Sequence, residues 1–184
     1  SNGVASWRAP DPFAAPSAFA IGTRPLATTS SVRAFWSVVT LLTVPMGRPS
    51  VVVEYFNAAL GHYFNTLDQV EIDALDAAKF VGWKRSIGAF VAYASAQDAP
   101  SGAVPVCRFF SPVYTSHFYT ADPEECATVE RQWPDVWILE SRAAFYIHVP
   151  DKVTGTCAAG LQPIYRMYNN QPIPNHRYIA DKKI

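Results

Sequence analysis

The chain has 184 residues, with 15 basic and 15 acidic residues, 49% hydrophobic residues and 16% charged residues. This composition excludes a disordered chain, and the zero formal net charge argues against an electrostatic nucleic-acid binder, which needs a basic face. Aromatic residues reach 14% and prolines number 15, a combination that is typical of strands separated by turns. The sequence holds no Gly-rich phosphate loop, Cys-x-x-Cys pair or Gly-x-Ser-x-Gly elbow.

Residues 1–46 differ in character from the rest. They are rich in Ala, Pro, Ser and Thr up to about residue 33, which indicates a leader, a linker or an N-terminal extension. The apolar stretch 34–46 is interrupted by polar residues and ends near a proline, so it is a buried strand or helix, or part of a non-native leader. No stretch reaches the roughly 18–20 apolar residues that a membrane-spanning helix needs.

From residue 51 onward an aromatic motif recurs. The first copy pairs VEYFN (53–57) with GHYFNT (61–66), the second CRFFS (107–111) with SHFYT (116–120), and the third YRMYN (165–169) with NHRYI (175–179). Aligned on their histidines, His62, His117 and His176, the copies have periods of 55 and 59 residues. We therefore predict a repeat domain over 47–184, with copies at 51–95 and 104–150 and a truncated copy at 161–184.

Each complete copy is predicted to be a hairpin, a short helix and two further strands. Asp68 and Asp122 have the spacing of helix caps, and Glu71 completes a capping box. In the first helix, Val70, Leu75 and Ala78 could share an apolar face. The final strands are expected at 89–93 and 143–147.

These motifs resemble a secreted bacterial repeat family, the domain of unknown function 5648. The resemblance covers about residues 47–184 and rests on VVEYFNAALGHYFNT and GWKR in the first copy, CRFFS, SHFYTADPEEC and AAFYIHVPD in the second, and IYRMYNNQPIPNHRYIAD in the third. Family members occur as repeats appended to exported enzymes or as stand-alone exported proteins, so the resemblance implies a binding or accessory role and supplies no catalytic residues. It also implies that the third copy stops early at Ile184.

The predicted fold is mainly β with short helices. Three copies of a four-strand unit favour a pseudo-threefold arrangement of the β-trefoil type, in which closure removes exposed sheet edges. The alternative is an open repeat array or a small propeller.

The candidate ligand-binding residues lie in the hairpins. Adjacent strand residues point to opposite faces, so one aromatic of each pair is expected in the core and the other at the surface, where it can stack on a sugar ring; the alternative is that both are buried between copies. The histidines have three interpretations: a structural role, ligand contact, or a shared metal site. The candidates are Tyr63, Asn65, His62, His117, Tyr119, His176 and Tyr178.

Charged residues give a weaker signal for function. Arg108 and Arg166 occupy the same place in their copies and are expected to pair with local carboxylates such as Asp122 and Asp181. A His/Asp pair can suggest hydrolysis, but no serine recurs beside it, so we predict no catalytic, metal or cofactor site.

The cysteines number three. Cys107 begins a predicted strand and Cys126 lies in the helix after the same hairpin, so the two could form a disulfide in an exported protein. Cys157 would then pair with a cysteine beyond Ile184. The alternative is three buried thiols.

Together these observations predict a non-catalytic binding or targeting module of a secreted or cell-surface protein, with a glycan or another surface polymer as its ligand. A structural or protein-interaction repeat is the second hypothesis, and a hydrolase, either an accessory or a catalytic domain, is the third. No nucleic-acid partner and no membrane span are expected, and the module could be fused to an exported enzyme.

Overall fold

A computed structural model describes residues 18–22, 47–169, 171 and 173–180. Within these ranges the chain forms strands and two short helices, in the order β1 (Ala18–Gly22), β2 (Ser50–Asn57), β3 (His62–Thr66), α1 (Gln69–Asp76), β4 (Trp83–Ala92), β5 (Val104–Pro105), β6 (Cys107–Ser111), β7 (Ser116–Thr120), α2 (Pro123–Gln132), β8 (Ile138–Ser141), β9 (Tyr146–Ile147), β10 (Leu161–Tyr168) and β11 (His176–Ile179).

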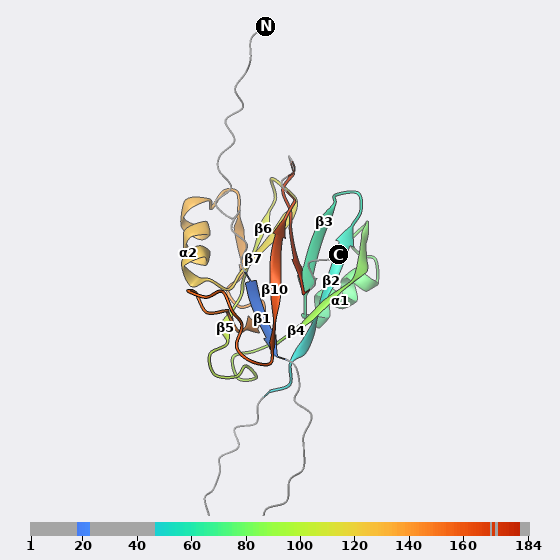
Figure 1. Ribbon diagram of the computed structural model, residues 1–184. Coiled ribbons are helices and arrows are strands. Elements are labelled where there is room, and N and C mark those ends of the chain that lie inside the picture. The colour runs from blue at the N-terminus through green and yellow to red at the C-terminus, as the bar shows by residue number, and fades with distance from the viewer. Residues whose placement is uncertain (1–17, 23–46, 170, 172, 181–184) are drawn as a thin grey trace, which may run out of the picture.

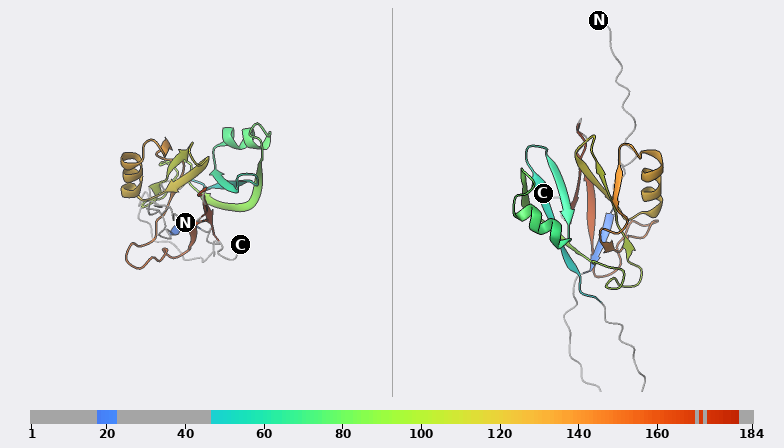
Figure 2. Two further views of the ribbon diagram at one scale, coloured as in Figure 1. Left: turned by 90° about the horizontal axis from the view of Figure 1, so that it is seen from above. Right: turned by 180° about the vertical axis from the view of Figure 1, so that it is seen from behind.

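Three antiparallel sheets of three strands each organise the described chain (Figure 1). The first sheet has the order β3-β2-β4, the second β7-β6-β8 and the third β11-β10-β1. Each is therefore a hairpin with one further strand added on the same side. A short pair, β5 with β9, stands apart from them. Seen from above, the three sheets stand around a shared centre, with α1 and α2 on the outside (Figure 2).

The fold is mainly β with two short helices in its described part, as the sequence predicts. The sheets are open and do not close into a barrel, so the β-trefoil is not confirmed. Strands β3, β7 and β11 contact one another at the centre without joining one ladder. Neighbouring sheets therefore meet through side chains, and each hairpin takes its third strand at its outer edge.

One face of each complete hairpin packs on the helix that follows it. Tyr55 and Phe64 lie opposite each other on β2 and β3 and form a buried cluster with Leu75 of α1. Phe109 and Phe118 occupy the matching places in the second sheet, where they pack with residues of α2. Alternation along the strands puts these aromatics on one face, which is why a short amphipathic helix can cover them.

The helices begin where the caps predict. The Asp68 carboxylate accepts hydrogen bonds from the N–H groups of Val70 (2.8 Å) and Glu71 (3.1 Å), and Asp122 accepts from Glu124 (2.9 Å). The predicted capping box is incomplete, because the N–H of Asp68 donates to the Thr66 hydroxyl (3.0 Å) instead of to Glu71.

The buried face of α1 differs from the prediction. Val70 is 78% exposed, and the buried residues are Ile72 and Leu75. Ala78 lies beyond the helix with a φ of 53°. The cap at Asp68 sets the phase of the helix, and this phase turns Val70 to solvent.

The strand register separates the histidines. His117 lies opposite Phe110, and His176 lies opposite Tyr168; each partner is the fourth residue of its strand motif, CRFFS or YRMYN. His62 instead lies opposite Asn57, the fifth residue of VEYFN. Tyr63 takes the place in the first hairpin that the two histidines hold in the others. The predicted equivalence of all three histidines is therefore wrong, because backbone pairing fixes the alignment and shifts the first copy by one residue.

Ion pairs connect neighbouring sheets. In each, an arginine from one hairpin reaches a glutamate of the next sheet or its helix: Arg108 with Glu71 (2.6 Å), Arg166 with Glu125 (2.9 Å) and Arg177 with Glu54 (3.0 Å). Each of these guanidinium groups also lies over an aromatic ring: Arg108 over Phe64 (5.3 Å to the centroid), Arg166 over Phe118 (5.1 Å) and Arg177 over Tyr63 (4.3 Å). The sheets are thus joined by the same combination of charge pairing and cation–π contact.

The predicted partners of the two hairpin arginines are different. Arg108 pairs with Glu71 and Glu140 instead of Asp122, which caps α2 and lies 3.9 Å from Lys152. Arg108 thus has one local carboxylate partner, Glu140 of its own sheet, while Glu71 lies across the sheet junction, as Glu125 does for Arg166. Asp181 lies outside the described residues.

A strand from the predicted leader, linker or extension belongs to the third sheet. β1 pairs with β10, from Ala18 opposite Tyr165 to Gly22 opposite Leu161. In the first sheet the matching side of the hairpin is taken by β4, which follows that hairpin in the chain. Residues 18–22 are therefore part of the folded domain. The apolar stretch 34–46 lies outside the described residues.

The predicted disulfide between Cys107 and Cys126 is present, with Cα atoms 6.2 Å apart. It ties the start of β6 to α2. Cys157 is a free, partly buried thiol, and burial raises its pKa.

Candidate functional site

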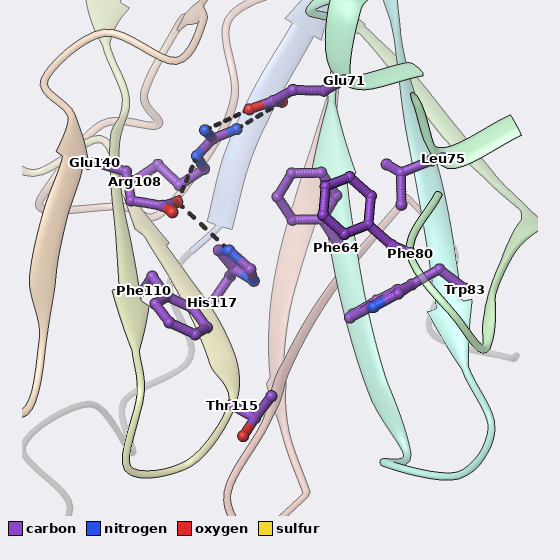
Figure 3. A pocket seen from close by; sticks show the side chains of 10 residues that line it. All are labelled: Phe64, Glu71, Leu75, Phe80, Trp83, Arg108, Phe110, Thr115, His117 and Glu140. Atoms are coloured by element: carbon purple, nitrogen blue, oxygen red, sulfur yellow. Dashed lines mark hydrogen bonds and ion pairs between the residues drawn. The ribbon is translucent and has the colours of Figure 1, made fainter. Parts of the chain in front are cut away.

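A cleft opens between the first and second sheets (Figure 3). We call it the inter-sheet cleft. Its volume is about 340 Å³, at the lower end of the roughly 300–1,000 Å³ typical of small-ligand sites. It is lined by Phe64, Glu71, Leu75, Phe80, Trp83, Arg108, Phe110, Thr115, His117 and Glu140.

The wall from the first sheet is apolar. Phe64 comes from β3, Leu75 from α1 and Trp83 from the start of β4, with Phe80 on the loop between α1 and β4. Figure 3 shows these four side chains together on one side of the cleft. The ring centroids of Phe64 and Trp83 lie 6.2 Å apart in an edge-on arrangement, and Phe80 is 55% exposed. Aromatic surface is therefore available to a ligand.

A clamp from β2 holds the loop that carries this wall. The Asn57 side-chain amide is buried and donates to the carbonyl of Val81 (3.2 Å). Gly82 has a φ of +86°, and a Cβ at that position would lie 2.8 Å from the Asn57 amide nitrogen. Only glycine fits this left-handed turn against the amide. The turn and the clamp together place Phe80 and Trp83 at the cleft.

The opposite wall carries a charged network. The Arg108 guanidinium makes two hydrogen bonds to Glu71 (2.6 and 2.9 Å), and its Nε lies 2.9 Å from a Glu140 oxygen. The same Glu140 oxygen lies 3.4 Å from Nε2 of His117. Figure 3 shows Arg108 bridging the two carboxylates above His117 and Phe110. The four side chains hold one another in place. Three of them come from strands of the second sheet, and Glu71 comes from α1.

Two members of the network, Glu140 and Arg108, keep their charges at neutral pH. Burial opposes ionisation of Glu140, but the hydrogen bond and charge of His117 and the charge of Arg108 outweigh it, so the pKa of Glu140 is lowered. Burial likewise opposes the charge of Arg108, and the bonds to Glu71 outweigh it, so the pKa of Arg108 is raised. Glu140 is therefore ionised and Arg108 protonated in the folded protein.

Comparison with family models supplies the identification. Residues 36–148, more than half of the chain, match the model described as domain of unknown function (DUF5648). The chain belongs to the DUF5648 family. The match includes the first and second sheets and both walls of the cleft, and it ends before β10. Comparisons with curated proteins and with solved structures find no match.

The described part of this DUF5648 domain lacks two features. Among its described residues no helix is long and apolar enough to span a bilayer. Over the same residues no group of three or more His, Cys, Asp or Glu side chains is placed to hold a metal ion.

The structure places the seven predicted binding residues in different surroundings. His117 lines the inter-sheet cleft. Tyr63 is partly buried beneath Arg177. The other five are buried near the centre of the domain: His62, Asn65, Tyr119, His176 and Tyr178.

The two buried tyrosines have a structural role. The Tyr119 hydroxyl donates to the carbonyl of Asn65 (2.7 Å) and accepts from its N–H (3.1 Å). The Tyr178 hydroxyl does the same with the backbone of Tyr119, at 2.8 Å for both bonds. Tyr119 is 2% exposed, so it is not the surface-facing aromatic that alternation predicts. Each hydroxyl crosses to the neighbouring sheet and joins it to its own.

Two histidines are also structural in their contacts. Nδ1 of His62 donates to the carbonyl of Thr115 (2.8 Å), which links the first hairpin to the turn of the second. His176 is 3% exposed, and burial together with the charge of Arg166 lowers its pKa to about 3.

Sequence reasoning missed most of the cleft. The GWKR motif contains Trp83, and Phe110 and Phe64 belong to the repeated motif, so these could have been found as candidates. Glu140 and Phe80 belong to no repeated pattern. Their role depends on the placement of one sheet against another, for which the sequence carries no local signal.

The inter-sheet cleft combines an aromatic wall with a few fixed polar groups. No cysteine or serine lines it, and its one hydroxyl belongs to the exposed Thr115. A glycosidase acid requires a carboxyl with a raised pKa, whereas the pKa of Glu140 is lowered by its partners. An aromatic wall facing fixed polar groups is the general composition of a ligand site.

Proposed function

We propose that this DUF5648 protein is a non-catalytic binding module and that its inter-sheet cleft holds a glycan. The observation that carries the proposal is the pairing of an aromatic wall, exposed Phe80 and partly buried Trp83, with a fixed polar wall made by Arg108, His117 and Glu140. The apolar face of a sugar ring can stack on the first wall, while its hydroxyls exchange hydrogen bonds with the second.

Preorganisation supports this proposal. Arg108 is anchored by Glu71 and lies over the Phe64 ring, so the polar wall keeps its shape without a ligand. Asn57 and Gly82 hold the aromatic wall in the same way. A site whose side chains are already ordered loses little entropy on binding.

We further propose that the protein works outside the cytosol, as a secreted or cell-surface protein that is fused to or associated with an exported enzyme. The disulfide between Cys107 and Cys126 supports this, because such bonds persist in oxidising compartments. The aromatic motif and the shared strand order of the three sheets also support the inference that they are copies of one unit. In this interpretation, β1 supplies the third strand of the sheet that the third copy forms.

The test measures how much of the protein is retained on insoluble polysaccharides and cell-wall preparations. Trp83→Ala should reduce retention on at least one polymer, because it removes the stacking surface of the cleft. Ile87→Ala is the matched control, since Ile87 lies on the same strand, is 88% exposed and does not line the cleft. Equal retention of both variants on every polymer that the native protein binds would contradict the proposal, as would no retention of the native protein.

A further inference from the structure

We propose that the ligand of the inter-sheet cleft carries a positive charge, and that it is an amine-bearing sugar in its free-ammonium form. This inference rests on the proposed glycan-binding function and specifies its chemistry. It follows from three observations: the surplus of carboxylate in the cleft, the exposed aromatic faces opposite, and the way this chain treats its own cations.

The cleft holds two carboxylates, Glu71 and Glu140, and one guanidinium, Arg108. The imidazole of His117 is already paired with Glu140, at 3.4 Å. Both oxygens of Glu71 are engaged by Arg108. In Glu140 only one oxygen lies within ion-pair distance of Arg108 and His117, and the side chain is 31% exposed. Glu140 therefore has an oxygen left to receive a donor from a ligand.

The wall facing Glu140 is suited to a cation. Phe80 and Trp83 present aromatic surface to the cleft, and the face of an aromatic ring attracts an ammonium or guanidinium group. The Arg108 guanidinium already lies over the Phe64 ring, so that ring has its cation partner. Phe80 and Trp83 lie beside it without a cation that the structure places over them, whereas Phe110 contacts the His117 ring at 5.0 Å between centroids. A ligand ammonium between these rings and Glu140 would complete the pattern.

The chain itself uses this arrangement at each sheet junction. Arg108, Arg166 and Arg177 each combine an aromatic face with a glutamate partner: Phe64 and Glu71, Phe118 and Glu125, and Tyr63 and Glu54. In the cleft, the aromatic rings and a glutamate oxygen are present and the cation is left for the ligand to supply. A uronic acid or a phosphate would instead place an anion beside Glu140, while Arg108 and His117 are already paired with carboxylates, and like charges repel.

The experiment compares three tetrasaccharides by isothermal titration: the free-amine oligomer of 2-amino-2-deoxyglucose, its N-acetylated form and a neutral glucose oligomer. The titrations use the full chain at about pH 6, where amines of this kind are largely protonated. The free-amine oligomer should bind at least about tenfold more tightly than the others, since a hydrogen bond to a charged group has this magnitude. Its affinity should fall when salt is raised from about 0.05 M to about 0.5 M, because screening weakens charge pairing.

Two variants separate this inference from the proposed function. Glu140→Gln should abolish the preference for the free-amine oligomer, and its melting curve verifies that the fold is kept. Trp83→Ala should weaken every oligomer that binds. Equal or weaker binding of the free-amine oligomer compared with the N-acetylated form would overturn the charge inference and leave the glycan proposal standing. Absence of binding to all three oligomers and to every polysaccharide would overturn both. The salt series on the native protein requires no variant and decides the charge inference independently.

Discussion

The first and second sheets share one strand order, and each packs on the helix that follows its hairpin. They differ in how that helix is attached to the sheet. In the second, the disulfide joins β6 to α2, and Trp137, the residue just before β8, is 7% exposed and packs on Phe118 and Tyr114. In the first, Val53 and Ile72 stand at the places of the two cysteines.

Instead of a covalent link, the first helix is tied to its sheet by polar groups. The Tyr55 hydroxyl donates to the Asp76 carboxylate (2.8 Å), and Arg85 pairs with the same carboxylate (2.5 Å). Trp83, which corresponds to Trp137, is left open at the cleft. This difference supports the proposed function, in which the second sheet contributes stability and the first presents a side chain for binding.

The two tryptophans give the largest expected contrast. Trp137→Ala should lower the free energy of unfolding by about 3–5 kcal/mol, the cost of truncating a buried aromatic residue. Trp83→Ala should cost roughly 1 kcal/mol, because Trp83 is only partly buried and removes less apolar surface from water than Trp137 does. Urea denaturation followed by circular dichroism measures both. Equal costs would mean that Trp83 is a core residue and that the inter-sheet cleft is closed in solution.

The disulfide is the next largest difference. Replacing Cys107 and Cys126 together with alanine should destabilise the protein by about 3 kcal/mol, because the cross-link restricts the unfolded chain over a 19-residue separation. The loss should appear as a lower midpoint in denaturant. An unchanged midpoint in the double variant would show that the bond contributes nothing to stability.

The same comparison can be tested by transfer. Val53 pairs with Thr66 as Cys107 pairs with Thr120, and Ile72 and Cys126 are both the fourth residue of their helices. Val53→Cys with Ile72→Cys should therefore form a second disulfide in the first sheet, detected by mass spectrometry of the unreduced protein. Two free thiols after oxidation would show that the two helices sit differently on their sheets.

His176 contributes a pH effect of intermediate size. Burial and Arg166 lower its pKa to about 3 in the folded protein, whereas an unfolded histidine titrates at about 6.5. Between these values the unfolded state binds the proton more tightly, so stability is lost as the pH falls below about 6.5. The loss should reach roughly 2 kcal/mol by about pH 4.5.

The measurement is the difference between the native protein and His176→Gln in denaturation curves from pH 7 to 4.5. The variant should lose less stability than the native protein over this range, although it starts lower at pH 7. His148→Gln is the control, since it removes a partly exposed histidine elsewhere. Parallel curves for the native protein and His176→Gln would contradict the assignment.

Local features of the fold could be predicted from the sequence, and long-range ones could not. The hairpins, the helix caps at Asp68 and Asp122 and the disulfide involve neighbouring stretches, and their patterns indicated them correctly. The strand 18–22 could not be recognised, because its partner β10 is distant in the chain and five small or apolar residues carry no distinct signal.

The site shows the same limit. Alternation predicted that one residue of each aromatic pair faces solvent, but Tyr119 crosses to the backbone of Asn65 in another sheet and is buried. The open aromatic surface lies instead at Phe80 and Trp83, where a loop meets the neighbouring sheet. A pattern within one strand specifies two faces, and it does not specify which face a neighbouring sheet covers.

The helix caps give the smallest contrast between the two sheets. Asp68 accepts two backbone hydrogen bonds and Asp122 accepts one, and Pro123 at the start of α2 has no N–H to satisfy. Asp68→Ala should therefore cost about 1 kcal/mol, and Asp122→Ala roughly half as much. Asp68→Ser is the matched control, because serine also caps helices well and should restore most of the loss. If the alanine and serine variants at 68 are equally unstable in urea, the carboxylate acts through its charge near the helix start instead of through its hydrogen bonds, and the contrast with Asp122 disappears.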